Sequence, residues 1–196
     1  DMLNVKEKEE TKYEAFINQV FKEVEQIDGL SATDIYESGL TIHTTLDVNS
    51  QEYVEEILAD DSNFPDDQFQ AGIVLLDTET GAVRAVGGGR NIDEDDNVER
   101  GWNFATDARR QPGSAIKPIM AYGPVIEHLQ WSTAKLIKDE KLVVNGHEIR
   151  NWDRNYRGWI SAREALKHSF NVPAVKTFME IGPDRAKKFA ENLGIK

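Results

Sequence analysis

The stretch RQPGSAIKP (residues 110–118) constrains the fold and the chemistry of this chain more than any other part of the sequence. A serine hydroxyl is a weak nucleophile near neutral pH unless a base removes its proton. On a helix, a lysine three residues after a serine lies on the same face and can act as that base. The first helical turn also points unpaired N–H groups and the positive end of the helix dipole toward the serine. The pattern predicts Ser114 as a nucleophile and Lys117 as its general base.

The residues around this pair support the prediction and add one constraint. Pro112 and Gly113 form a turn pattern that presents Ser114 at the start of a structural element. Pro118 disfavours the α conformation at Lys117, so we expect a 3₁₀-like or irregular first turn. A Ser-x-x-Lys match is short, and the alternative is a chance match in which the lysine is solvated.

A second polar element, Ser169-Phe170-Asn171, lies downstream. Ser161 and Glu164 stand at the capping-box spacing of a helix that precedes this element, and Pro173 suits the first turn of the next helix. We therefore expect the serine and the asparagine at a break between two helices, where both side chains can point into a cleft. The alternative is that both are ordinary helix-break residues, because Ser and Asn are common in turns.

In combination, these motifs resemble the transpeptidase domain of penicillin-binding proteins, whose motif set includes Ser-x-x-Lys, a Ser-x-Asn element and Lys-Thr/Ser-Gly. The resemblance is to the bifunctional (class A) type and covers about residues 13–196. It rests on five segments. Residues 37–47 match the approach to the domain, residues 71–88 its first hairpin, and residues 104–114 the approach to the nucleophile. Residues 151–158 match a loop near the cleft, and residues 165–175 match the second motif and its helices. The implied fold class is α/β (α+β), of the serine β-lactamase and D,D-transpeptidase type, with an antiparallel sheet flanked by helices and an all-helical lobe.

The chain departs from the family pattern at the third motif. Lys176-Thr177 is followed by Phe178 and falls in a helical pattern, so it does not supply Lys-Thr/Ser-Gly. In the resembled fold, strands after that motif complete a sheet of about five strands. We therefore expect an incomplete sheet and a chain truncated before the third motif. The implied organisation is a linker or inter-domain region at residues 1–70 and the N-terminal part of the transpeptidase domain at residues 71–196.

The resemblance implies a catalytic role for four residues. Ser114 attacks the carbonyl of a D-Ala-D-Ala stem peptide to form an acyl-enzyme, and Lys117 takes its proton, although the identity of the base is disputed in this superfamily. Ser169 passes a proton to the leaving D-alanine. Asn171 donates its amide to the substrate and helps to hold the lysine. An amine from a second stem then takes the acyl group and cross-links peptidoglycan, whereas β-lactams leave the serine acylated.

The implied partners are peptidoglycan stem peptides, β-lactams and the missing C-terminal part of the same domain, and no metal or organic cofactor is needed. We expect the parent protein to be membrane-anchored at the extracytoplasmic face of the bacterial cell membrane, and this fragment to be soluble. Two alternatives stay open. One is a hydrolase on the same scaffold, a serine β-lactamase or D,D-carboxypeptidase, and the other is a fragment that only binds partners. Because the third motif is missing, we expect the isolated chain to be inactive.

Composition excludes several other classes of function. The 35 acidic residues outnumber the 23 basic ones, and the net charge of −12 argues against nucleic-acid binding, which needs Lys and Arg. The absence of Cys excludes disulfides, thiolate catalysis and zinc–thiolate sites. The 4 histidines show no metal-ligand spacing. No apolar run approaches the ~20 residues of a membrane-spanning helix.

Periodicity predicts the elements around the motifs. Helices are expected at residues 12–27, 49–58, 116–129 and 184–193, the second capped by Asn49 with Glu52 at the capping-box position. Extended segments are expected at 41–46, in a hairpin at 73–76 and 82–86, and in a small hairpin at 142–149.

Three further expectations concern the remaining segments. Residues 1–11 are expected to be a frayed start, residues 91–100 a surface loop, and Gly87-Gly88-Gly89 a site of close approach. Most of four aromatic residues are expected in the core: Trp131, Trp152, Tyr156 and Trp159. Arg109 and Arg110 either steer an anionic stem peptide or are ordinary surface charge.

Overall fold

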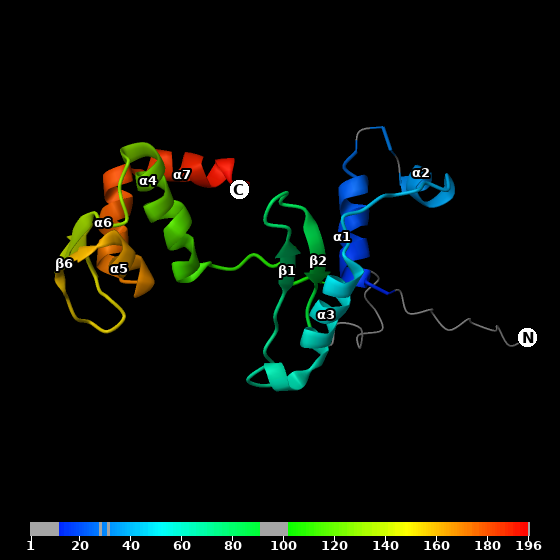
Figure 1. The fold of residues 1–196 in the computed structure, drawn as a ribbon, viewed down its shortest axis with the longest axis horizontal. Helices are drawn as coiled ribbons and strands as arrows, with labels where there is room; N and C mark the ends of the chain where they lie inside the picture. Colours follow the sequence, from blue (N-terminus) through cyan, green and yellow to red (C-terminus); the bar gives the residue numbers. More distant parts are fainter. Residues whose placement is uncertain (1–11, 28, 31, 91–101, 196) are drawn as a thin grey trace, which may run out of the picture. The chain divides into compact units, whose positions relative to one another are not determined.

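A computed structural model describes residues 12–27, 29–30, 32–90 and 102–195, which form two compact units of mixed helix and strand (Figure 1). The first unit ends at Arg109 and the second begins at Arg110. The predictions for residues 1–11 and 91–100 lie outside the described residues. The division predicted at residue 70 stays a prediction.

The first unit is built on an antiparallel hairpin, which confirms the sequence prediction. Strands β1 (Ile73–Leu76) and β2 (Val83–Gly87) pair with Val74 opposite Val86. The carboxylate of Asp77 accepts hydrogen bonds from the backbone of Glu79 and Thr80 and so organises the turn between them. The helical elements of this unit are α1 (Glu14–Val24), α2 (Ala32–Glu37), α3 (Val48–Ala59) and the 3₁₀ turn η1 (Asp61–Asn63).

Helix α3 packs closely on β2. Val54 and Leu58 of α3 form a buried cluster with Ala85 of β2. A Cβ atom on Gly87 would lie 2.4 Å from Leu58 Cδ1 and 2.5 Å from Val54 Cγ1, so any larger residue would force these two side chains to shift. This confirms the close approach predicted for the triple-glycine segment.

Two predictions in the first unit are wrong. Residues 41–46 form no strand. They are largely exposed, so neither face of the alternating pattern packs against a core that would hold the segment in a sheet. Only isolated bonds tie the segment to β2, such as Thr45 Oγ1 to Val83 O at 2.6 Å. Helix α3 is capped by Asp47 rather than Asn49, since the Asp47 carboxylate accepts from Ser50 N at 2.8 Å. Glu52 accepts instead from the Tyr13 hydroxyl at 2.8 Å.

The second unit combines a helical group with two small antiparallel pairs (Figure 1). Its helical elements are the 3₁₀ turn η3 (Gly113–Ile116), the π-helical turn η4 (Pro118–Tyr122), α4 (Gly123–Leu129), α5 (Ala162–Lys167), α6 (Asn171–Ile181) and α7 (Pro183–Asn192). Its strands are β3 (Leu136–Asp139), β4 (Leu142–Val144), β5 (His147–Ile149) and β6 (Gly158–Ser161). The hairpin of β4 and β5 confirms the prediction, with Asn145 and Gly146 both at positive φ.

The pairing of β3 with β6 was not predicted. Ile137 and Asp139 are the buried positions of β3, so the second inward position carries a carboxylate where an apolar side chain would be expected. Because of this carboxylate, the segment lacks the alternation of apolar and polar residues that predicts a strand. The register places Asp139 opposite Gly158.

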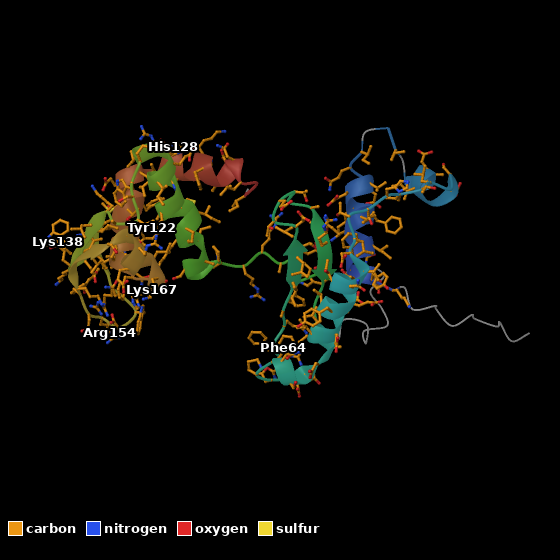
Figure 2. The ribbon with its side chains drawn as sticks, viewed as in Figure 1. Phe64, Tyr122, His128, Lys138, Arg154 and Lys167 are labelled. Carbon is orange, nitrogen blue, oxygen red and sulfur yellow. The ribbon has the colours of Figure 1, made fainter. Side chains whose placement is uncertain are left out.

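The first helical region of the second unit is irregular, as Pro118 led us to expect. A 3₁₀ turn precedes Lys117 and a π-helical turn follows it, although Lys117 itself is in the α conformation. In the π turn, Gly123 N donates to Pro118 O, five residues earlier. Tyr122 and Ala121 then enter a core with Ile137, Ala162, Ala165 and Ala174 (Tyr122 is labelled in Figure 2).

Candidate active site

Ser114 lies on the exposed 3₁₀ turn η3, directly after Gly113, whose φ of 55° favours glycine. The backbone of the turn closes through Lys117 N, which donates to Ser114 O. Within the part of the chain that the structure describes, no hydrogen bond joins Ser114 Oγ to Lys117 Nζ. Ser114 and Lys117 are therefore neighbours in one turn, but their side chains form no hydrogen bond with each other.

Lys117 is bonded instead to the second motif. Its Nζ donates to Ser169 O at 2.6 Å, to Ser169 Oγ at 3.0 Å and to Asn171 Oδ1 at 2.8 Å. Ser169 and Asn171 lie 52 and 54 positions after Lys117 in the sequence. Burial of the ammonium group lowers the pKa of Lys117 below its ordinary value. The structure thus brings Lys117, Ser169 and Asn171 together.

Ser169 occupies a position that usually belongs to glycine. It follows the end of α5 in the left-handed conformation, with φ of 54°. Ser169 N donates to Leu166 O and Phe170 N donates to Ala165 O, which is the Schellman arrangement at a helix C-terminus. A serine in this conformation costs about 1 kcal/mol relative to glycine. The strained backbone turns both Ser169 O and Ser169 Oγ toward Lys117.

The orientation of the Asn171 amide is fixed by a third partner. Asn171 Nδ2 donates to Arg150 O at 2.8 Å, which leaves Oδ1 to face Lys117 Nζ. Asn171 N donates to Asn151 Oδ1 at 2.9 Å, so the loop at residues 150–151 holds both the backbone and the side chain of this residue. Asn151 lies in the segment that the resemblance placed near the cleft, but its contact with Asn171 and that of the Arg150 carbonyl were not predicted.

The three acceptors around Lys117 Nζ determine how a proton can leave it. An ammonium group has three N–H donors, and each meets one acceptor here. A neutral amine keeps two donors and gains a lone pair. Ser169 O and Asn171 Oδ1 can only accept, whereas the Ser169 hydroxyl can also donate. When Lys117 is neutral, its lone pair therefore faces the hydroxyl of Ser169.

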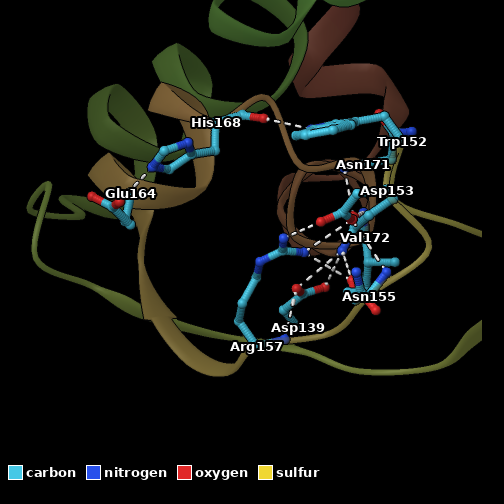
Figure 3. Close-up of polar contacts among 10 residues, drawn as sticks. Asp139, Trp152, Asp153, Asn155, Arg157, Glu164, His168, Asn171 and Val172 are labelled. Atoms are coloured by element: carbon cyan, nitrogen blue, oxygen red, sulfur yellow. Dashed lines mark hydrogen bonds and ion pairs between the residues drawn. The ribbon is translucent and has the colours of Figure 1, made fainter.

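The surrounding residues give mixed outcomes for the other predictions. Trp152 and Trp159 are 68% and 64% exposed, so the expectation that most of these aromatics lie in the core is wrong. Trp152 Nε1 donates to His168 O at 3.1 Å, which places the exposed indole one residue from the second motif (Figure 3).

Lys176 and Thr177 lie within α6, as predicted. Arg109 and Arg110 are exposed.

The described residues contain neither a candidate metal site nor a membrane-spanning helix. In the described ranges, no group of three or more His, Cys, Asp or Glu residues is placed to hold a metal ion. Over the same ranges, no helix is both long and apolar enough to cross a membrane.

Comparisons with known proteins agree with the motif pattern. A family model described as the penicillin binding protein transpeptidase domain matches residues 71–196. Penicillin-binding protein 1A/1B from Bacillus subtilis is 46% identical over 185 residues, which cover 94% of this chain and 19% of that protein. Penicillin-binding protein 1A from Streptococcus pneumoniae is 34% identical over 194 residues, which cover 96% of this chain and 27% of that protein. The chain thus spans between a fifth and about a quarter of these relatives.

A solved structure shares the fold over nearly the whole chain. The PonA1 protein from Mycobacterium tuberculosis in complex with penicillin V matches with a TM-score of 0.77 and 25% identity. The match covers 91% of this chain and 45% of that one. The fold is therefore that of penicillin-binding transpeptidases, as the motifs predicted.

Proposed function

This chain belongs to the penicillin-binding protein transpeptidase family, and we propose that it carries the nucleophile and the proton-transfer groups of a D,D-transpeptidase. The observation that carries the proposal is the contact of Lys117 Nζ with Ser169 Oγ and Asn171 Oδ1 at 3.0 and 2.8 Å. It joins two motifs from distant parts of the sequence around one amine with a lowered pKa. Titratable groups with a perturbed pKa are concentrated at functional sites.

The proposed chemistry begins with Ser114. Its Oγ attacks the carbonyl of the D-Ala-D-Ala bond of a stem peptide, and its proton passes to neutral Lys117. Because Ser114 Oγ and Lys117 Nζ are not bonded in the described structure, the substrate must bring them together, as catalytic hydrogen bonds often tighten only in the complex. The Ser114 N–H stabilises the oxyanion.

Proton delivery to the leaving group uses Ser169. The protonated Lys117 gives a proton to Ser169 Oγ, and the hydroxyl of Ser169 gives its own proton to the nitrogen of the departing D-alanine. The acyl group remains on Ser114 until the amine of a second stem peptide attacks it. Ser114 is then released and a peptide cross-link has formed. Asn171 holds Lys117 in place throughout and donates its amide to the substrate.

The proposed partners follow from the same chemistry. They are peptidoglycan stem peptides and β-lactams, which acylate the same serine, and the site needs no cofactor. From the family resemblance we propose that the parent protein is membrane-anchored and works at the extracytoplasmic face of the bacterial membrane. For the isolated chain we propose no catalysis, because the Lys-Thr/Ser-Gly motif is not part of it.

Mass spectrometry after exposure to labelled penicillin tests the proposal. The comparison uses the 196-residue chain and an extended chain, defined as this chain joined to the residues that follow the matched region in the Bacillus subtilis relative. We expect an adduct on Ser114 in the extended chain, none in its Ser114→Ala variant, and none in the 196-residue chain. An extended chain without an adduct would refute the proposed site. Rapid release of hydrolysed penicillin would instead indicate a hydrolase.

A further inference from the structure

Helix α6 begins without a cap of its own. Its N-cap residue is Phe170, whose side chain offers no hydrogen-bond acceptor. Asn171 N and Val172 N, the first two N–H groups of the helix, donate to Asn151 Oδ1 at 2.9 and 3.1 Å. Phe170 N is bonded to Ala165 O, and Pro173 has no N–H. One side chain from another segment thus caps the helix that carries Asn171.

Asn151 is itself anchored in a buried position. It is 2% exposed, and its Nδ2 donates to Asp139 at 2.9 Å (Oδ1) and 3.0 Å (Oδ2) and to Asn155 O at 2.9 Å. Asp139 is 1% exposed and also accepts from Arg157 N at 3.0 Å. Figure 3 shows Asp139 and Asn155 near Asn171 and Val172, the first two residues of α6.

The carboxylate determines which way the Asn151 amide points. An ionised carboxylate can only accept hydrogen bonds. A reversed amide would place Asn151 Oδ1 against both oxygens of Asp139 and leave the two N–H groups of α6 facing a donor. Burial makes such unmatched groups costly, because water cannot replace the lost partners. Asp139 therefore keeps Asn151 Oδ1 directed at α6.

We propose that Asn151 and Asp139 are positioning residues that hold Asn171, and through it Lys117, in the geometry needed for proton transfer. The inference rests on the proposed function of Lys117. Its physical basis is a continuous chain of contacts from Asp139 through Asn151 and Asn171 to Lys117 Nζ. The adjacent carbonyl of Arg150 holds the Asn171 side chain, so one loop sets both the position and the rotation of that amide.

Amide hydrogen exchange on the 196-residue chain tests the positioning without requiring activity. Asn151→Asp places a second carboxylate against Asp139, and we expect Asn171 N and Val172 N to exchange about tenfold faster, as for a lost helix cap. Amides in α7 serve as the reference, because a general loss of stability would accelerate them equally. Equal acceleration of the α7 amides, or no acceleration at Asn171 and Val172, would overturn the proposal.

A reciprocal double substitution separates positioning from simple packing. Asn151→Asp combined with Asp139→Asn restores a donor facing an acceptor, and it keeps an acceptor for the N–H groups of α6. We expect exchange at Asn171 and Val172 to return at least halfway toward the wild-type rate. A double variant that is as fast as the single Asn151→Asp variant would refute the role of Asp139.

The matched control uses a second buried asparagine of the described residues, one that also caps backbone N–H groups. Asn103 Oδ1 accepts from Ala105 N at 2.9 Å and Thr106 N at 3.2 Å in the first unit. We expect Asn103→Asp to leave exchange at Asn171 and Val172 unchanged. Acceleration there would mean that the effect of Asn151→Asp is not local, which would count against the proposal.

Acylation of the extended chain connects positioning to chemistry. We expect Asn151→Asp to slow formation of the Ser114 adduct by about tenfold or more and the double substitution to restore part of the rate. If the unaltered extended chain forms no adduct, the proposed function fails, while the exchange results still decide whether the positioning exists. A normal acylation rate in Asn151→Asp, with accelerated exchange, would overturn the link to Lys117.

Discussion

Asn171 faces Lys117 with its oxygen atom, 2.8 Å from Nζ, because its amide nitrogen already donates to Arg150 O at 2.8 Å. An amide oxygen stabilises an ammonium without forming an ion pair. Lys117 is therefore held in place, and its pKa stays below the ordinary value because burial disfavours the charged ammonium.

Asn171→Asp is expected to raise the pKa of Lys117. A carboxylate at this position forms an ion pair with Nζ and favours the charged lysine. Lys117 then becomes a poorer base near neutral pH. An NMR titration that follows the Lys117 Hε protons measures the change. Asn192→Asp, at the exposed end of α7, is the matched control, and an unchanged Lys117 pKa in Asn171→Asp would contradict the contact.

Ser169→Gly is expected to separate stability from function. Glycine adopts the left-handed conformation at φ of 54° without strain, so the variant should be as stable as the wild type or up to about 1 kcal/mol more stable. Ser169→Ala loses the same hydroxyl but keeps the strain, and should be less stable than Ser169→Gly. Urea denaturation measures both. Both variants should show slow acylation in the extended chain, and rapid acylation in either would rule out the proton relay.

The lowered pKa of Lys117 predicts a pH dependence of stability. The unfolded chain binds this proton more tightly than the folded chain, so unfolding takes up a proton between the two pKa values. Stability from this residue is therefore lost below the folded pKa and recovers as the pH rises toward the ordinary value of 10.5. Lys117→Met removes this slope.

Other groups titrate in the same range, so the measurement must be a difference. The free energies of unfolding of the wild type and Lys117→Met are compared at several pH values between 7 and about 10.5, and the Tyr groups that titrate near about 10 are common to both proteins and cancel in the difference. We expect the wild type to gain stability relative to the variant as the pH rises. A difference that stays constant, or falls, would show that burial does not destabilise the charged lysine.

The extent to which the sequence predicted the site depends on how local each signal is. Ser114, Lys117, Ser169 and Asn171 are predicted as site residues because short motifs fix residue types at fixed spacings. The capping box at Ser161 was identified on the same ground, and Ser161 Oγ accepts from Glu164 N at 3.1 Å. The meeting of Ser169 and Asn171 around Lys117 Nζ was implied only by the resemblance, since no local pattern links residues 52 positions apart.

Asn151 and Asp139 could not be predicted in this way. Both are residue types typical of turns and surfaces, and their roles depend on the pairing of β3 with β6. Glu164 shows the same limit on a smaller scale, because its carboxylate contacts His168 Nε2 at 2.7 Å rather than completing the capping box. Segment 41–46 failed for the opposite reason: its alternation was clear, but tertiary structure left it exposed.

Tyr122 carries a buried hydroxyl whose removal is expected to leave stability unchanged or raise it. The residue is 4% exposed, and within the described part of the chain its Oη has no hydrogen-bond partner. Burial also raises the pKa of this phenol above its ordinary value. A buried polar group without a partner costs about 1–3 kcal/mol in desolvation. Tyr122→Phe should therefore be as stable as the wild type or more stable by about 1 kcal/mol.

The comparison variant for Tyr122 tests whether its ring is essential to the core. The ring packs with Ala121, Ile137 and Ala165, so Tyr122→Ala should lose about 3–5 kcal/mol. Circular dichroism during urea denaturation measures both variants without relying on tyrosine absorbance. If Tyr122→Phe is less stable by more than about 1 kcal/mol, then the hydroxyl has a partner in solution. That result would direct attention to a bound water or to a further segment of the protein contacting this side chain.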